Sequence, residues 1–175
     1  MPNDRLFRRI AIVGNAGAGK SSLAREIAKR LGTEAVHLDR LLWEPGWRIV
    51  EEGEFRRRHD ALLQRENWVI EGLGYPSTLE ARFRAADLAI FTRYPLWRCY
   101  WWSLKRELRP GIAAGRPDGC PMAPSALRLV RSIWRTQRDV VPEIDRLLAR
   151  LGPGTQVRVL ASPAEVPPLL TDLAP

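Results

Sequence analysis

Nine consecutive residues near the amino end have the types and spacing of a phosphate-binding loop. The segment Gly14-Asn15-Ala16-Gly17-Ala18-Gly19-Lys20-Ser21-Ser22 matches G-x-x-x-x-G-K-[ST], with an apolar run before it and a helical pattern after it. Glycine leaves room for successive backbone N–H groups to surround a phosphate, and the positive end of the following helix adds attraction. We expect Lys20 to contact the β- and γ-phosphates and the Ser21 hydroxyl to hold Mg²⁺. All nine residues are therefore predicted to bind ATP.

Two carboxylates follow other apolar runs of the chain. Asp39 follows residues 35–38, and Glu71 follows residues 68–70. Because Mg²⁺ prefers oxygen ligands, Glu71 is predicted to hold the metal directly or through water. Asp39 is predicted to receive a hydrogen bond from the hydroxyl group of an acceptor molecule and to act as its base. A helix or turn cap is the alternative role for Asp39.

Three arginines flank or lie within a loop. Residues 110–124 contain four prolines and three glycines, a composition that predicts irregular structure. Such a loop can close over bound phosphates as a lid does, excluding water and bringing cations to the reacting group. We therefore predict a lid over about residues 106–124, in which Arg106 and Arg109 act in catalysis and Arg116 binds the nucleotide.

The histidines and cysteines support weaker hypotheses. His37 falls in an apolar run, where it is expected to pack rather than to bind a ligand, and His59 on a charged helix needs no role. Cys99 and Cys120 have no C-x-x-C partner and no histidine at metal-ligand spacing, so zinc is not expected.

Tryptophan is frequent in two segments. Trp43 and Trp47 line an acceptor pocket or pack in the core, which is the commoner use of tryptophan. Trp97, Trp101 and Trp102 alternate with basic residues, as in a platform on which bases stack. Their helical spacing favours packing in the core or at a lid hinge.

The elements that must position these residues follow from the apolar pattern. Short apolar runs predict strands at residues 10–13, 35–39, 68–72, 88–91 and 157–160. Helices are expected between them, whereas residues 40–53 resemble a loop. A long helical pattern follows Ser125, and Pro142 should kink or divide it. Strands that alternate with helices predict an α/β fold with a parallel sheet and right-handed crossovers.

The predicted sheet gathers four residues at one edge. Ligands of parallel α/β sheets bind beyond the carboxyl ends of the strands. Gly14, Asp39, Glu71 and Arg93 all fall at such ends. We therefore expect a single site there.

Length and composition indicate one domain over residues 1–175. The hydrophobic content of 45% and the charged content of 27% are typical of globular proteins. Two cysteines are too few for a disulfide framework, and residues 1–9 lack the apolar centre of a signal peptide. Residues 96–104, the most membrane-like run, are too short to span a bilayer. We expect a soluble, cytoplasmic monomer or homodimer without a membrane partner.

The positive charge is concentrated in one part of the chain. Residues 82–135 contain eleven basic and three acidic side chains, whereas the rest contains seventeen of each. A local basic cluster suits a polyanionic ligand, either nucleotide phosphates or nucleic acid. A solvated arginine-rich helix surface is the alternative interpretation.

Several motifs together resemble the bacterial topology-modulation family, which is related to adenylate kinase. They are residues 10–31, His37-Leu38-Asp39, Trp43-Glu44-Pro45-Gly46-Trp47, Trp68-Val69-Ile70-Glu71-Gly72 and Arg116-Pro117-Asp118-Gly119-Cys120-Pro121. The resemblance implies a three-layer, adenylate-kinase-like P-loop NTPase fold with strand order 2-3-1-4-5, a small lid, and ATP and Mg²⁺ binding. It also implies Asp39 near the acceptor and Arg106 and Arg109 in the lid. This chain has Glu71 where relatives carry Asp, and Gly72-Leu73-Gly74-Tyr75 replaces a shorter Gly-Asn-Tyr.

An ATP-dependent kinase that acts on a small molecule is the function that these observations favour. The acceptor is a nucleoside, a nucleotide or another small alcohol. A nucleotide-dependent regulator of DNA topology is the second hypothesis, although no helix-turn-helix or zinc-finger spacing supports nucleic-acid binding. A nucleotide-binding switch without turnover is the third.

Overall fold

The computed structural model describes residues 7–107, 119 and 126–173. Its main sheet has five parallel strands in the order β2-β5-β1-β6-β7. Their bounds are β1 Arg9–Gly14, β2 Ala35–His37, β5 Trp68–Glu71, β6 Leu88–Thr92 and β7 Gln156–Leu160. Counted along the chain within this sheet, the order is 2-3-1-4-5. The predicted strands, their parallel pairing and their order are confirmed.

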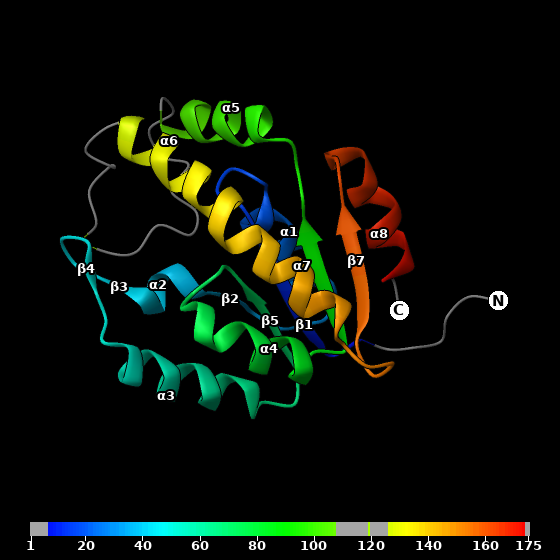
Figure 1. The fold of residues 1–175 in the computed structure, drawn as a ribbon. Coiled ribbons are helices and arrows are strands. Elements are labelled where there is room, and N and C mark those ends of the chain that lie inside the picture. The colour runs from blue at the N-terminus through cyan, green and yellow to red at the C-terminus, as the bar shows by residue number, and fades with distance from the viewer. Residues whose placement is uncertain (1–6, 108–118, 120–125, 174–175) are drawn as a thin grey trace.

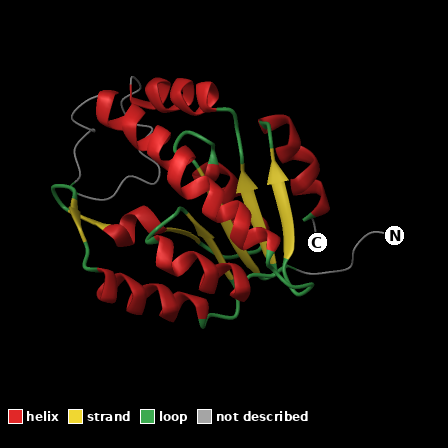
Figure 2. Ribbon diagram, viewed as in Figure 1, coloured by secondary structure: helices red, strands yellow, loops and turns green. Residues whose placement is uncertain are grey.

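Alternate residues of β1 enter two hydrophobic clusters, one on each face of the sheet. Ile10 and Ile12 join the cluster formed with α1 (Lys20–Arg30), α5 (Leu96–Glu107) and α8 (Val166–Asp172). Ala11 and Val13 join the cluster formed with α3 (Glu52–Leu63), α4 (Leu79–Ala85) and α7 (Val141–Ala149). A strand covered on both faces is apolar throughout, as β1 is. The fold is therefore a three-layer α/β arrangement (Figures 1 and 2).

The segment expected to be a loop at residues 40–53 contains regular structure, so that prediction was wrong. Helix α2 (Leu38–Leu42) is followed by an antiparallel hairpin of β3 (Trp43–Glu44) and β4 (Arg48–Ile49). Pro45-Gly46 forms the turn, and the φ angles of Gly46 and Trp47 are 78° and 62°. Residues that favour strands, Trp43 and Ile49, pair across the hairpin. Asp39 accordingly lies in the first turn of α2 rather than at the end of a strand.

The long helical pattern near the carboxyl end is divided as predicted. Helix α6 (Ala126–Arg135) continues into a π-helical turn (Thr136–Val140), and α7 begins just before Pro142. Proline has no N–H to donate to the preceding turn, which interrupts the regular α-helical bonds. Among the helices of the described ranges, none is long and apolar enough to cross a membrane.

Candidate nucleotide-binding site

The glycines of the loop between β1 and α1 divide into two kinds. A Cβ atom on Gly14 would lie 2.2 Å from Thr92 Oγ1, and one on Gly17 would lie 2.3 Å from the carbonyl oxygen of Cys99. A Cβ atom on Gly19 would meet nothing within 4 Å. The first two glycines therefore let the loop approach β6 and α5, whereas the third faces open space at the start of α1.

Hydrogen bonds hold the loop in this shape. The buried Asn15 side chain donates from Nδ2 to the carbonyl oxygen of Ile133 in α6 at 2.8 Å. Its Oδ1 accepts from the backbone N–H of Ala16, also at 2.8 Å. The Lys20 Nζ donates to the carbonyl oxygen of Asn15 at 2.8 Å, so the ammonium group lies across the loop. The loop is thus tied to α6 and carries a cation.

Gly17 and Gly19 provide a matched test of this packing. Both have left-handed φ angles, 73° and 72°, so alanine is strained at either position by about 1–2 kcal/mol. Only Gly17→Ala also collides with backbone, which adds about 1–3 kcal/mol. We expect urea unfolding to show Gly17→Ala to be less stable than Gly19→Ala by about 2 kcal/mol. Equal stabilities would contradict the close packing of α5 on the loop.

Ser21, His37 and Glu71 form a buried polar cluster at the start of α1. The Ser21 hydroxyl donates to Glu71 Oε1 at 2.8 Å, and His37 Nδ1 lies 2.7 Å from the same oxygen. Glu71 is 5% exposed. Burial raises the pKa of Glu71, but the hydrogen bond from His37, the charge of Lys20 and the Ser21 hydroxyl outweigh it, so the net pKa is lowered. Glu71 is therefore ionised, and His37 donates to it.

His37 is packed, as expected from the sequence, with only 9% of its side chain exposed. It also has a polar partner, because it pairs with Glu71 across neighbouring strands, in register. The run that contains His37 identified the strand, but not the partner that its ring meets.

Asp39 lies beside this cluster. A Cβ atom on Gly72 would be 3.9 Å from Asp39 Oδ1, which places the carboxylate against the backbone that follows Glu71. Burial and the charge of Glu71 raise the pKa of Asp39, while Lys20, Arg106 and His37 oppose the rise. The residue nevertheless retains surface that water reaches. Asp39 is therefore open to solvent beside the cluster, where a ligand can meet it.

The structure brings together only some of the predicted residues. Lys20, Asp39, Glu71 and Arg106 interact electrostatically. Arg93 instead pairs with Asp145 of α7 at 3.0 Å. Arg109, Arg116 and most of the predicted lid at 106–124 lie outside the described residues, as does Ser125. Gly119, within that segment, accepts a hydrogen bond from the Gly46 N–H of the hairpin turn at 3.1 Å.

The tryptophans of α5 do not pack in the core, so the expectation of core packing was wrong, whereas most of the predicted lid at 106–124 lies outside the described residues. Trp97, Trp101 and Trp102 are 63%, 58% and 48% exposed. The buried side of α5 carries Cys99 and Ser103, one turn apart, which face Gly17. Close approach to the loop requires small residues there, and the large rings fall on the outer face. Trp43 and Trp47, in the hairpin, contact each other edge to face at 5.6 Å between ring centroids.

The loop after Glu71 rests on a buried arginine that sequence reasoning missed. Arg82 of α4 is fully buried and donates from Nη2 to the carbonyl oxygen of Leu73 at 3.1 Å. Its Nε and Nη1 have no partner among the described residues. Burial lowers the pKa of Arg82 to about 10, against the attraction of Glu71. The guanidinium therefore stays charged at neutral pH beneath the site.

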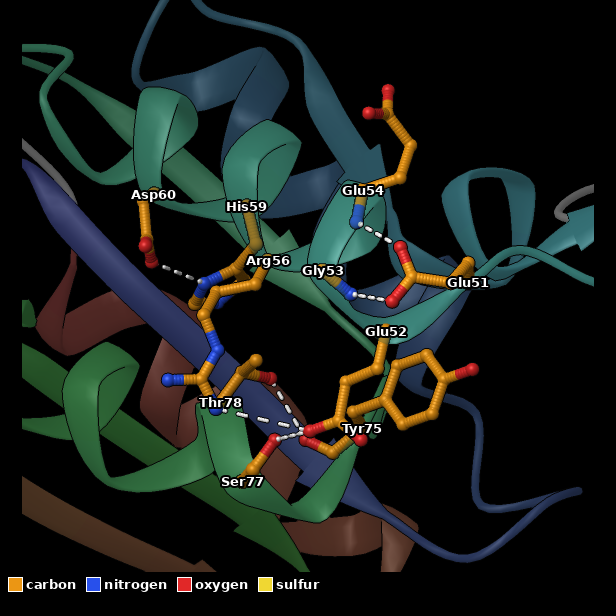
Figure 3. Close-up of polar contacts among 10 residues, drawn as sticks. All are labelled: Glu51, Glu52, Gly53, Glu54, Arg56, His59, Asp60, Tyr75, Ser77 and Thr78. Carbon is orange, nitrogen blue, oxygen red and sulfur yellow. Dashed lines mark hydrogen bonds and ion pairs between the residues drawn. The ribbon is translucent and has the colours of Figure 1, made fainter.

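His59, on the charged helix α3, is fully buried beside the same loop (Figure 3). Its ring stacks on Phe55, which contacts Tyr75 edge to face at 5.3 Å. Burial, followed by the charge of Arg82, lowers the pKa of His59. The Ser77 hydroxyl donates to Glu52 Oε1 at 2.5 Å and fastens the end of the loop to α3. The spacing of α3 places His59 on the same face as Phe55 and Leu62, four residues after the first and three before the second.

Replacing Arg82 with methionine tests the cost of this buried charge. The unpaired nitrogens of Arg82 are desolvated, and methionine fills a similar volume without charge. We expect Arg82→Met to raise the free energy of unfolding by about 1 kcal/mol. Arg84→Met is the control, because Arg84 is exposed and its pair with Glu80 contributes little. Destabilisation by Arg82→Met in urea unfolding would show that the Leu73 bond outweighs the desolvation.

The fold and the loop geometry define a three-layer α/β P-loop protein. No family model matches the chain, and no curated protein matches it. Among solved structures, it is similar to a shikimate kinase from Bacteroides thetaiotaomicron, with a TM-score of 0.61 and 17% identity over 95% of this chain and 96% of that one. It is also similar to a shikimate kinase from Acinetobacter baumannii in complex with shikimate, with a TM-score of 0.57 and 16% identity over 95% of this chain and 90% of that one. A gluconokinase from Sinorhizobium meliloti 1021 has a TM-score of 0.56 and 21% identity over 97% of this chain and 93% of that one. The chain therefore has the fold of P-loop kinases.

Proposed function

We propose that this chain is an ATP-dependent kinase that transfers the γ-phosphoryl group to a hydroxyl of a small molecule. One observation supports this proposal most directly. Three separate segments bring four polar side chains together beside one loop, namely Lys20, Ser21, Glu71 and Asp39. Phosphoryl transfer needs little more than a cradle, cations and a group that orients the acceptor. We further propose that residues 1–175 form one kinase domain, with a lid at about residues 106–124.

The residues present fit ATP and Mg²⁺. A Cβ atom on Gly19, the N-cap of α1, would meet nothing within 4 Å, so the positive end of the helix has open space beside it for a phosphate. Ser21 Oγ and Glu71 Oε1 are oxygen ligands of the kind that Mg²⁺ prefers, and they lie 2.8 Å apart. Mg²⁺ neutralises charge on the phosphates when it is bound. His37 holds Glu71 in position, as a hydrogen-bonded neighbour of a metal ligand does.

Asp39 is proposed to orient the acceptor hydroxyl and accept its proton. Its raised pKa makes it a stronger base than an ordinary aspartate. Lys20 and Arg106 lie close enough to influence Asp39 and supply positive charge for the transferred group. The proposed roles thus place the base and the cations on either side of the reacting phosphoryl group.

The neighbouring structures support this assignment in its general form. They are named shikimate kinase and gluconokinase, which are kinases of small molecules. The resemblance to the topology-modulation family supports nucleotide binding as well. It also supplies the competing hypothesis, a nucleotide-dependent effect on DNA.

The test is ADP formation from ATP and Mg²⁺ with a panel of nucleosides, nucleotides and small alcohols. Acceptor-dependent ADP release, with a phosphorylated product identified by mass spectrometry, would establish the kinase. Duplex DNA binding that weakens steeply with salt, without turnover of any acceptor, would favour the regulator instead.

A further inference from the structure

The loop at residues 72–75, which follows the proposed metal ligand, packs on the helix that carries Asp39. A Cβ atom on Gly72 would lie 3.3 Å from Leu38 Cβ and 3.9 Å from Asp39 Oδ1. One on Gly74 would lie 3.3 Å from Leu38 Cδ1, on the same first turn of α2. The backbone of the loop therefore forms a wall beside Asp39, and a shift of the loop changes the space in which Asp39 would meet an acceptor.

Separate hydrogen bonds hold the two ends of the loop and its middle. At the start, the Gly72 N–H donates to a carbonyl oxygen of β1 at 3.1 Å. At the end, the Tyr75 hydroxyl donates to the carbonyl oxygen of Val50 at 2.7 Å. Between them, the carbonyl oxygen of Leu73 accepts from Nη2 of Arg82 at 3.1 Å. Arg82 therefore holds the middle of the loop in its place against α2.

A buried guanidinium is a costly means of holding one carbonyl group. Arg82 is fully buried, and its Nε and Nη1 have no partner among the described residues. An apolar side chain of similar volume would avoid the desolvation of these nitrogens. Local choices that cost stability are expected at functional sites. Arg82 also lies close enough to Glu71 for the two charges to attract, which places it within reach of the proposed site.

We propose that Arg82 is a positioning residue for the acceptor. Through the carbonyl oxygen of Leu73 it holds the loop at residues 72–75 against α2, and so it fixes the space beside Asp39 in which the acceptor hydroxyl is oriented. This inference rests on the proposed kinase function and adds to it a residue that touches neither ATP nor the acceptor. Small displacements of groups that orient a substrate cost large factors in rate, so a loop held at its middle favours turnover.

The hold of Arg82 on the loop can be tested on the full chain without any substrate. Hydrogen exchange followed by NMR reports how often each backbone N–H opens. We expect Arg82→Met to speed exchange of the Gly72 N–H about tenfold, the effect of losing one hydrogen bond in the loop, while the N–H groups within β1 keep their protection. Arg84→Met, an exposed change on the same helix, is the control and should alter neither. Unchanged exchange of Gly72 in Arg82→Met would overturn the inference.

The kinetic test compares the acceptor with the nucleotide. Adenosine, AMP, ribose and glycerol are the acceptor probes, and the one that gives the fastest ADP formation is used. Arg82→Met should lower kcat/KM for that acceptor about ten- to a hundredfold, whereas the Kd of a non-hydrolysable ATP analogue stays within about twofold. Arg82→Lys keeps a cation that can donate to Leu73 and should recover kcat/KM to within about threefold of wild type. Parallel losses in acceptor turnover and in affinity for the ATP analogue would indicate a merely structural role and overturn the inference.

A second pair of variants moves the same loop without changing any charge. Gly74 and Gly32 have left-handed φ angles of 63° and 62°, so alanine is similarly strained at both. A Cβ atom on Gly74 would lie 2.6 Å from Phe55 Cζ, whereas one on Gly32 would meet nothing within 4 Å. We expect Gly74→Ala to lower kcat/KM for the acceptor about tenfold or more, and Gly32→Ala to stay within about twofold of wild type. Wild-type kinetics in a folded Gly74→Ala variant would overturn the link between the loop and the acceptor.

The two kinds of measurement separate this inference from the proposed function. Absence of ADP formation by the wild type with every acceptor would contradict the kinase, while faster exchange of Gly72 in Arg82→Met would leave the hold of Arg82 on the loop standing. Wild-type turnover that Arg82→Met and Gly74→Ala both leave unchanged would establish the kinase and overturn the positioning role.

Discussion

Replacing Lys20 with alanine is expected to lower acceptor-dependent ADP formation on the order of a thousandfold, because it removes the cation that we propose contacts the transferred phosphate. The ammonium group already lies across the loop, 2.8 Å from the carbonyl oxygen of Asn15. It needs only to exchange that carbonyl for a phosphate oxygen. A charge held in place before the reaction stabilises the transition state without the cost of ordering it.

Lys29→Ala is the matched control for this variant. Lys29 lies in the last turn of α1, on the same helix but exposed and at the end opposite the loop. Its removal should leave the turnover number within about twofold of wild type, as is usual for exposed sites. Circular dichroism must show that both variants fold. Turnover by Lys20→Ala within tenfold of wild type would contradict the placement of the γ-phosphate.

The sheet could be predicted from the sequence because its strands are covered on both faces. Continuous apolar runs such as residues 10–13 arise only where helices pack above and below. Because these strands alternate with helices along the chain, only a few arrangements of the strands in the sheet are possible. The hairpin at 43–49 was missed because its strands have two residues each, too short for any periodicity to show.

The part of the candidate site that could be predicted is the part whose residues are close together along the chain. The loop from Gly14 to Ser22 is contiguous, so its sequence alone specified it. His37 was not predictable, because its contact with Glu71 depends on the register between β2 and β5. The buried face of α5 was also misjudged. In α5, the close approach to Gly17 selected small residues for burial and turned the tryptophans outward.

Arg82 shows a further limit of sequence patterns. A charged residue in a short helix is normally expected to face water. Here the residues around the loop after Glu71 close over the guanidinium, and the carbonyl oxygen of Leu73 is its one hydrogen-bond partner in the described structure. Only the three-dimensional packing shows that this cation lies beneath the proposed metal ligand.

Asp39→Asn is expected to lower kcat about a hundredfold or more, because asparagine cannot accept the proton of the acceptor hydroxyl. The equilibrium affinity for ATP should stay within about twofold, since Asp39 is proposed to contact the acceptor and not the nucleotide. In the wild type, the rate should fall as the pH drops through the raised pKa of Asp39, because protonation removes the base. Equal losses in kcat and in ATP affinity would remove Asp39 from the acceptor role.

The same substitution is expected to stabilise the fold, and the sign follows from the pKa. Asp39 has a higher pKa in the folded chain than its ordinary 3.8, so the folded state holds the proton more tightly than the unfolded state does. Ionisation therefore costs stability as the pH rises from below 3.8 through the raised pKa. At pH values above the raised pKa, Asp39→Asn should raise Tm, by an amount that solvent screening keeps small because Asp39 is exposed. Asp172→Asn, an exposed change at the end of α8, should leave Tm unchanged. A lower Tm for Asp39→Asn at pH 7 would mean that the carboxylate is stabilised where it lies, and its charge would then serve structure rather than the acceptor.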